Sequence, residues 1–170
     1  TASFSVTGLV GGPSGNTADD SDIVRFVPAT TGNSTSGAFE FIFDGSDVGL
    51  TTNGEDVDAI SVNSLGQLVL STTGTANANS ISKNRDEDLM TFAATGLGSS
   101  TSGNFSRHFD GSDVGLGGSG SDDVDAFHWT SGSAGYMSCL GNFTANGLSG
   151  GDEDVFEFVG TFGTSTSGNF

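Results

Sequence analysis

The chain has 170 residues and a formal net charge of −17 at pH 7, with 21 acidic residues against 4 basic ones. This charge excludes a nucleic-acid partner, because phosphate binding requires a basic surface. Only 2 prolines are present, which excludes a collagen-like chain, and 14 phenylalanines among regularly placed Val, Leu and Ile favour a packed fold over disorder. No apolar run is long enough to cross a bilayer, so no membrane span is expected.

Short runs of alternating apolar residues predict strands of about five residues, separated by turns rich in Gly, Ser, Asn and Asp. In chain order, the first four predicted strands cover residues 23–27, 39–43, 57–60 and 68–70. The next four cover residues 89–92, 104–109, 124–129 and 136–140. No segment combines a 3.6-residue period with helix caps, so helix should be nearly absent.

An internal repeat organises the sequence. Phe-Asp-Gly-Ser-Asp-Val-Gly-Leu, called the octapeptide below, occupies residues 43–50 and recurs letter for letter at 109–116, an offset of 66 residues. Two other motifs occur three times at nearly the same spacing. Asp-x-Asp followed by apolar residues lies at 20–26, 86–92 and 152–158, and Thr-Ser-Gly-x-Phe lies at 35–39, 101–105 and 166–170. Residues 55–60 match residues 122–127 after an insertion of one residue.

These repeats predict an all-β array over residues 1–170, made of four-stranded antiparallel units. Its predicted parts are a closing strand of a preceding unit at 1–10, repeat 1 at 19–75, repeat 2 at 85–142 and the start of repeat 3 at 151–170. A four-stranded unit at fixed period resembles a β-propeller blade, and a row of β-sandwich modules or a β-solenoid is the alternative. Each unit needs a neighbour to cover its apolar faces. Incomplete outer units therefore predict self-association through the chain ends, into a ring or a filament.

Carboxylates gather in the Gly-rich turns of every repeat. Calcium requires six to eight oxygen ligands, which closely spaced aspartates on a flexible loop can supply. The sequence therefore proposes calcium as a structural cofactor. The candidate ligands are Asp44, Asp47, Asp56, Asp58, Asp110, Asp113, Asp123 and Asp125, with the Asp-x-Asp pairs Asp20, Asp22, Asp86, Asp88, Asp152 and Asp154.

Two other interpretations of these carboxylates stay open at this point. Asp-Gly and Asn-Gly are good turn formers, so the side chains could serve only to cap turns. They could also form a solubilising or halophilic surface. The repetition of the whole set favours the metal-binding interpretation, because bound cations would relieve the electrostatic repulsion within so acidic a protein.

Catalysis has little support in the sequence, and we expect no enzyme. The only histidines, His108 and His128, occupy non-equivalent positions and accompany no nucleophile, zinc or phosphate-loop motif. Both are expected to be strand residues. Trp129 and Tyr136 are the only Trp and Tyr. Packing is the first expectation for them, and a sugar-stacking role is the alternative.

The octapeptide, followed by Gly-Glu-Asp-Val-Asp-Ala at 54–59, resembles an Asp/Gly-rich tandem β-repeat of secreted or cell-surface bacterial proteins. This resemblance implies an extracellular or cell-surface repeat protein and implies no activity. The scarcity of lysine and the Ser/Thr/Gly-rich composition favour the same location. The sequence thus predicts a non-enzymatic, extracellular calcium-binding β-repeat protein with a structural or adhesive role. The alternative is a carbohydrate-binding, lectin-like β-propeller module that binds cell-surface glycans.

Overall fold

The structure is a computed structural model, and it describes residues 2–5, 10–11, 17–117 and 120–170. The all-β prediction is confirmed, since 51% of the chain is strand and 5% is helical. All strand pairs in the described part of the chain are antiparallel.

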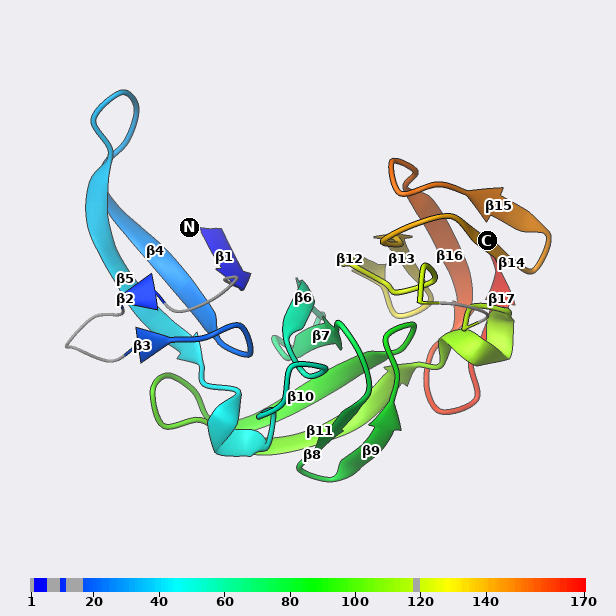
Figure 1. The fold of residues 1–170 in the computed structure, drawn as a ribbon, viewed down its shortest axis with the longest axis horizontal. Helices are drawn as coiled ribbons and strands as arrows, with labels where there is room; N and C mark the ends of the chain where they lie inside the picture. Colours follow the sequence, from blue (N-terminus) through cyan, green and yellow to red (C-terminus); the bar gives the residue numbers. More distant parts are fainter. Residues whose placement is uncertain (1, 6–9, 12–16, 118–119) are drawn as a thin grey trace.

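Three larger sheets follow one another along the chain (Figure 1). The first has the strand order β1 (Ala2–Ser5), β4 (Ile23–Thr30), β5 (Ser36–Phe43). The second has the order β11 (Ser102–Phe109), β10 (Leu89–Gly96), β7 (Leu68–Thr72), β6 (Val57–Val62). The third has the order β12 (Ala126–Ser131), β13 (Ala134–Ser138), β16 (Phe156–Thr161), β17 (Ser167–Asn169).

The sequence predicted that the four strands of one repeat would form one sheet. In the structure they are divided between two sheets. The first two strands of repeat 1, β4 and β5, belong to the first sheet, whereas its last two, β6 and β7, pair with the first two strands of repeat 2. Each sheet is therefore offset by half a repeat. Successive repeats are consequently joined by backbone hydrogen bonds between strands, here between β7 and β10 and between β13 and β16.

The register between repeats is the same in all three sheets. Val24 of β4 lies opposite Phe4, Met90 of β10 lies opposite Leu70, and Phe156 of β16 lies opposite Met137. Two residues further along the later strand, each sheet has a phenylalanine that is also paired across the strands. These residues are Phe26 in β4, Phe92 in β10 and Phe158 in β16. The β1 segment thus pairs with β4 as β7 pairs with β10.

Each of the three larger sheets has a short hairpin between two of its neighbouring strands, namely between β1 and β4, between β7 and β10, and between β13 and β16, and none of these hairpins was expected from the sequence. They are β2 (Val10–Gly11) with β3 (Thr17–Ala18), β8 (Ala76–Ala78) with β9 (Ile81–Asn84), and β14 (Phe143–Ala145) with β15 (Leu148–Gly150). The last one turns through Asn146 and Gly147, both with positive φ (44° and 85°). Asn-Gly is the sequence most typical of such a two-residue turn, so the sequence does indicate a hairpin at this position.

The apolar core lies between successive sheets. One cluster contains Ile23 and Phe43 from the first sheet with Leu70 and Phe92 from the second. The other joins the opposite face of the second sheet to the third, for example through Val69. Strand β7 is accordingly buried along its whole length. A strand covered on both faces is what stacked sheets require.

Each larger sheet is a meander, as a propeller blade would be, but the described residues form no closed ring. In Figure 1 the hairpins β4–β5, β10–β11 and β16–β17 lie along the left, lower and right sides, and β1 and β17 lie on opposite sides of the structure. Strands β6 and β12, at the inner edges of neighbouring sheets, contact each other. The structure therefore shows stacked antiparallel sheets, and the propeller stays a prediction.

Candidate functional site

The octapeptide forms a compact connector after the second strand of each repeat. Its serine, second aspartate and valine form the 3₁₀ helix η2 (Ser46–Val48) in repeat 1, and the matching helix η3 (Gly111–Val114) in repeat 2 includes the glycine before them. The helix ends at a left-handed glycine, Gly49 with φ 97°. Such a backbone favours glycine, because a Cβ would be strained there.

The apolar residues of the octapeptide insert between neighbouring sheets. Phe43, Val48 and Leu50 are completely buried in the cluster between the first and second sheets. The equivalent Phe109 is also completely buried, between the second and third sheets. The edge of the Phe43 ring contacts the ring of Phe92, with centroids 5.1 Å apart. The octapeptide thus fills the space between one sheet and the next.

The polar residues of the octapeptide bind the Thr-Ser-Gly loop of the next repeat. The Asp44 amide donates to Thr101 Oγ1 (2.9 Å), and the Thr101 amide donates to Asp47 Oδ2 (2.8 Å). The Thr101 hydroxyl donates in turn to the carbonyl of Gly98 (2.8 Å), within its own loop. Thr101 is only 5% exposed as a result. We call this set of contacts junction 1.

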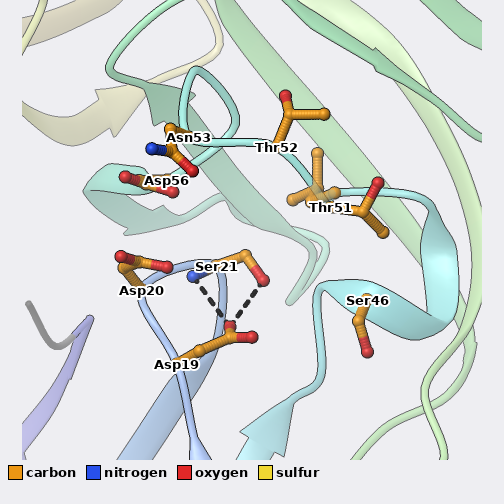
Figure 2. Close-up of a pocket in the computed structure, with 9 residues that line it drawn as sticks. Asp19, Asp20, Ser21, Ser46, Thr51, Thr52, Asn53 and Asp56 are labelled. Atoms are coloured by element: carbon orange, nitrogen blue, oxygen red, sulfur yellow. Dashed lines mark hydrogen bonds between the residues drawn. The ribbon is translucent and has the colours of Figure 1, made fainter. Parts of the chain in front are cut away.

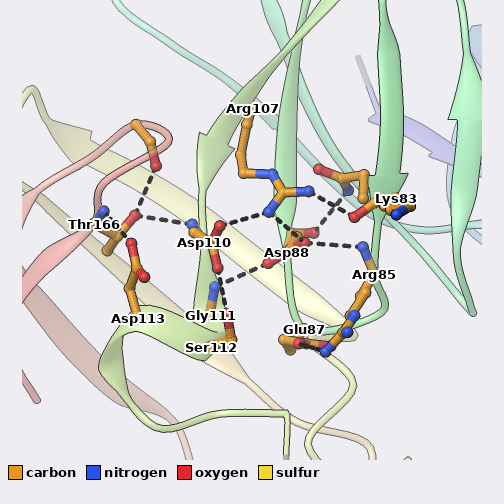
Figure 3. Close-up of polar contacts among 12 residues, drawn as sticks. Lys83, Arg85, Glu87, Asp88, Arg107, Asp110, Gly111, Ser112, Asp113 and Thr166 are labelled. Atoms are coloured by element: carbon orange, nitrogen blue, oxygen red, sulfur yellow. Dashed lines mark hydrogen bonds and ion pairs between the residues drawn. The ribbon is translucent and has the colours of Figure 1, made fainter.

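Junction 2 repeats these contacts between repeats 2 and 3 (Figure 3). The Asp110 amide donates to Thr166 Oγ1 (2.8 Å), and the Thr166 amide donates to Asp113 Oδ2 (2.9 Å). Thr166 donates to the Gly163 carbonyl (2.9 Å) and is 4% exposed. The same two hydrogen bonds therefore join each pair of repeats, and the same third bond holds each threonine within its own loop. In the sequence, Thr-Ser-Gly stood out only as a repeated motif, and this role of its threonine was not predicted.

The glycine of Thr-Ser-Gly is required by a close approach within the same hairpin. A Cβ on Gly103 would lie 2.5 Å from the Ala93 carbonyl oxygen and 2.6 Å from the ring of Phe92. Gly37 and Gly168 are crowded in the same way by a phenylalanine of the preceding strand. The motif therefore combines a threonine that binds the octapeptide with a glycine over which a phenylalanine ring packs.

The second aspartate of each Asp-x-Asp pair caps a tight turn. Asp22 Oδ2 accepts from the Asp19 amide and Oδ1 from the Gly45 amide of the octapeptide, both at 2.9 Å. Asp88 makes the same two bonds in repeat 2, and Asp154 Oδ2 accepts from the Gly151 amide. Burial raises the pKa of Asp22 to about 6, although its two backbone hydrogen bonds favour the ionised form.

Repeat 2 adds an arginine to this arrangement. Arg107 Nη1 contacts Asp88 Oδ2 (3.2 Å) and Asp110 Oδ2 (2.5 Å), and Nη2 donates to the Lys83 carbonyl. Burial alone would raise the pKa of Asp110, but hydrogen bonds from Ser112 and Arg107 and the guanidinium charge hold it below its ordinary value. The equivalent position in repeat 1 is Phe41. The two repeats therefore share their backbone contacts and differ in charge.

An acidic pair faces a polar pocket beside junction 1. Asp20 and Asp56 point toward each other across a pocket of about 370 Å³, which is also lined by Asp19 and Asn53 (Figure 2). Burial raises the pKa of Asp56, and Asp20 and Asp19 raise it further. Carboxylate and amide oxygens are the ligands that calcium prefers. This pocket is the best candidate for a cation among the described residues.

A second acidic group lies between repeats 1 and 2. Asp123 is 4% exposed and its Oδ1 has no hydrogen-bond partner among the described residues. Burial raises its pKa, and Asp58 and Asp86 raise it further. Asp58 accepts from the Ser71 hydroxyl, and burial likewise raises its pKa. The neighbouring Asp125 accepts from Ser138 (2.7 Å).

The predicted calcium ligands thus have several different environments. Asp44, Asp47, Asp110 and Asp113 lie at the junctions, and Asp152 is exposed in the turn before β16. Asp22, Asp88 and Asp154 cap turns, as the turn-forming interpretation predicts. In the described part of the chain, no three Asp, Glu, His or Cys side chains are placed so that they could hold one metal ion.

The residues considered for catalysis or sugar stacking lie in the third sheet and at its border. His108 is buried in β11 and stacks on Phe162, with ring centroids 4.7 Å apart. Burial lowers its pKa to about 4. Trp129 is half-buried in the same aromatic group, 5.0 Å from His108. Tyr136 is exposed on β13 and His128 on β12.

No protein-family model matches the chain, and no curated protein or solved structure shows significant similarity to it. The fold itself defines an all-β protein of stacked antiparallel sheets. Within the described residues, no helix has the length and hydropathy that crossing a membrane requires.

Proposed function

We propose that the protein is a non-enzymatic, extracellular structural repeat protein in which each octapeptide attaches one repeat to the next. The observation that carries this proposal is the identity of the two junctions, in each of which a buried threonine accepts one hydrogen bond from the octapeptide and donates another to it. Residues conserved between repeats thus serve attachment rather than a reaction. The extracellular location is supported by the composition and by the resemblance of the octapeptide to repeats of secreted proteins.

The first test removes the threonine hydroxyl from a junction. Thr101→Val keeps the side-chain shape but leaves the partly buried Asp44 amide without its acceptor, so we expect a loss of about 1–3 kcal/mol in the free energy of unfolding. The matched control is Thr35→Val at the equivalent exposed position, with an expected change within about 0.5 kcal/mol. Urea denaturation of the full chain measures both values. Equal changes in the two variants would contradict the proposed role of the junctions.

Calcium is the second part of the proposal, as a structural cofactor of the acidic pocket beside junction 1. The supporting observation is the Asp20–Asp56 pair facing oxygen-lined space, with the pKa of Asp56 raised by burial and by its acidic neighbours. A divalent cation would offset this repulsion and would bind the folded chain more tightly than the unfolded one. In repeat 2, Asp86 and Asp123 occupy the positions equivalent to Asp20 and Asp56.

Calcium binding is tested by unfolding the chain in EDTA and then in calcium. At a hundred times its dissociation constant, calcium is expected to raise the free energy of unfolding by about 2.7 kcal/mol. Asp56→Asn should reduce this gain, and Asp152→Asn, at an exposed position, should leave it unchanged. Magnesium serves as the ionic-strength control. A gain that is absent, or that is equal in magnesium or in Asp56→Asn, would contradict a calcium site in this pocket.

A further inference from the structure

The acidic pocket beside junction 1 contains one side chain whose charge can change by covalent chemistry. Asn53 lines this pocket together with Asp20 and Asp56, and its side-chain amide is uncharged (Figure 2). Asn53 is exposed in a turn, and Gly54 follows it. Asparagine is a chemically labile residue, above all before glycine, because a residue without a Cβ lets its backbone nitrogen reach the asparagine Cγ.

The reaction at such a pair requires only water. The Gly54 backbone nitrogen bonds to Cγ of Asn53, the Cγ–Nδ2 bond breaks, and Nδ2 leaves as ammonia with the proton of the Gly54 nitrogen. Water then opens the five-membered imide at one of its two carbonyls. The product at position 53 is an aspartate or an isoaspartate, and both carry a carboxylate in place of the amide.

The attacking nitrogen is free at Gly54 but is occupied at the Asp-Gly pairs of the two octapeptides. Within the described residues, the Gly54 amide donates no hydrogen bond. The Gly45 amide instead donates to Asp22 and the Gly111 amide to Asp88, in buried bonds of 2.9 Å. The octapeptides are therefore protected from the corresponding imide formation, whereas the turn at Asn53 is open to it.

The only other Asn-Gly pair of the sequence, Asn146–Gly147, is held more firmly. It forms the turn of β14–β15, whose strands pair directly on both sides of it, and Asn146 Nδ2 donates to the Gly168 carbonyl (3.5 Å). Ring closure there must break this bond and distort the hairpin. In the described part of the chain, the side chain of Asn53 makes no hydrogen bond, and only its backbone carbonyl accepts one.

We propose that Asn53 is a site of spontaneous deamidation, and that the carboxylate formed there raises the affinity of the acidic pocket for calcium. The second half of this inference rests on the proposed function, because it assumes that the pocket binds calcium. The product adds a carboxylate to those of Asp20 and Asp56, and calcium affinity depends on the number of charged ligands. In the absence of calcium, the same charge increases the repulsion within the pocket.

The first test incubates the folded chain at mildly alkaline pH and analyses its proteolytic peptides by mass spectrometry. We expect the mass change from amide to carboxyl at Asn53 about tenfold faster than at Asn146, because the hairpin turn must first open. Gly54→Ala should slow the conversion about tenfold, since its Cβ hinders the attacking nitrogen. This variant should fold, because the nearest atom to that Cβ is the Thr75 nitrogen at 3.7 Å.

The second test measures calcium binding by titration calorimetry. Asn53→Asp supplies the product directly and should bind calcium about tenfold more tightly than the freshly prepared chain. Asn146→Asp, which adds the same charge outside the pocket, is the matched control and should bind calcium as the unmodified chain does.

These outcomes separate the inference from the function on which it rests. Conversion at Asn53 that is absent, or no faster than at Asn146, would overturn the modification site. Equal calcium affinity of Asn53→Asp and the unmodified chain would overturn its effect on the pocket. If Asn53 is converted while neither chain binds calcium, the proposed calcium site is rejected and the modification site stands.

Discussion

Replacing Phe43 or Phe109 by Ala is expected to lower the free energy of unfolding by about 3–5 kcal/mol. Both side chains are completely buried, and each inserts from its octapeptide between two sheets. Phe43 contacts Phe92, and Phe109 contacts Phe158, in both cases edge to face with centroids 5.1 Å apart. Truncation would therefore leave a cavity at the contact between repeats, where a repeat array derives much of its stability.

Urea denaturation of the two variants measures this loss. Phe41→Ala is the matched control, because Phe41 lies in the same strand as Phe43 but is only half-buried. We expect the control to lose less than half as much stability. Losses in Phe43→Ala and Phe109→Ala that do not exceed the control would contradict the role of the octapeptide as the contact between sheets.

Stability is expected to fall as the pH rises from about 4 to about 8. Burial raises the pKa of Asp22 to about 6, and burial with neighbouring carboxylates raises that of Asp123 to about 8. A carboxyl group with a higher pKa in the folded state binds its proton more tightly when folded. Its contribution is therefore present at low pH and is lost as the pH rises through the folded-state pKa. We expect a difference of roughly 2–4 kcal/mol between pH 4.5 and pH 8.

Below this range the trend should reverse. Hydrogen bonds hold the pKa of Glu55 and of Asp110 below their ordinary values despite burial, so their contributions are lost as the pH falls below about 4. Asp123→Asn should flatten the profile between pH 6 and pH 8, whereas the exposed Asp152→Asn should follow the unmodified chain. Denaturant titrations at a series of pH values measure the profile. Stability that is constant or rises from pH 4.5 to pH 8 would contradict the burial of these carboxyl groups.

The strands were predictable because their apolar residues alternate locally. The runs at 39–43 and 68–70 fall within β5 and β7. The pairing of strands was not predictable in the same way, because a period of two shows which face is buried but not which strand is the neighbour. The half-repeat offset of the sheets therefore appeared only in the structure. The hairpins β8–β9 and β14–β15 were missed because their strands have only three or four residues.

The candidate site was predictable only in part. The octapeptide and the carboxylates that the repeats share were evident from the sequence. Their partners were not, because Asp44 and Thr101 lie 57 residues apart and neither residue carries a local signal of the other. The contact of Arg107 with Asp88 was equally hidden, since it exists only once β10 and β11 have paired. The three occurrences of Thr-Ser-Gly-x-Phe were the one available signal of the junctions.

The most direct test of the account is amide hydrogen exchange at the three equivalent threonines of the folded chain. The Thr101 and Thr166 amides each donate to an aspartate of the preceding octapeptide, whereas Thr35 lies exposed. We predict slow exchange at Thr101 and Thr166, rapid exchange at Thr35, and a selective loss of protection at Thr101 in Asp47→Asn. Exchange at Thr101 and Thr166 as rapid as at Thr35 would contradict the claim that octapeptides attach one repeat to the next.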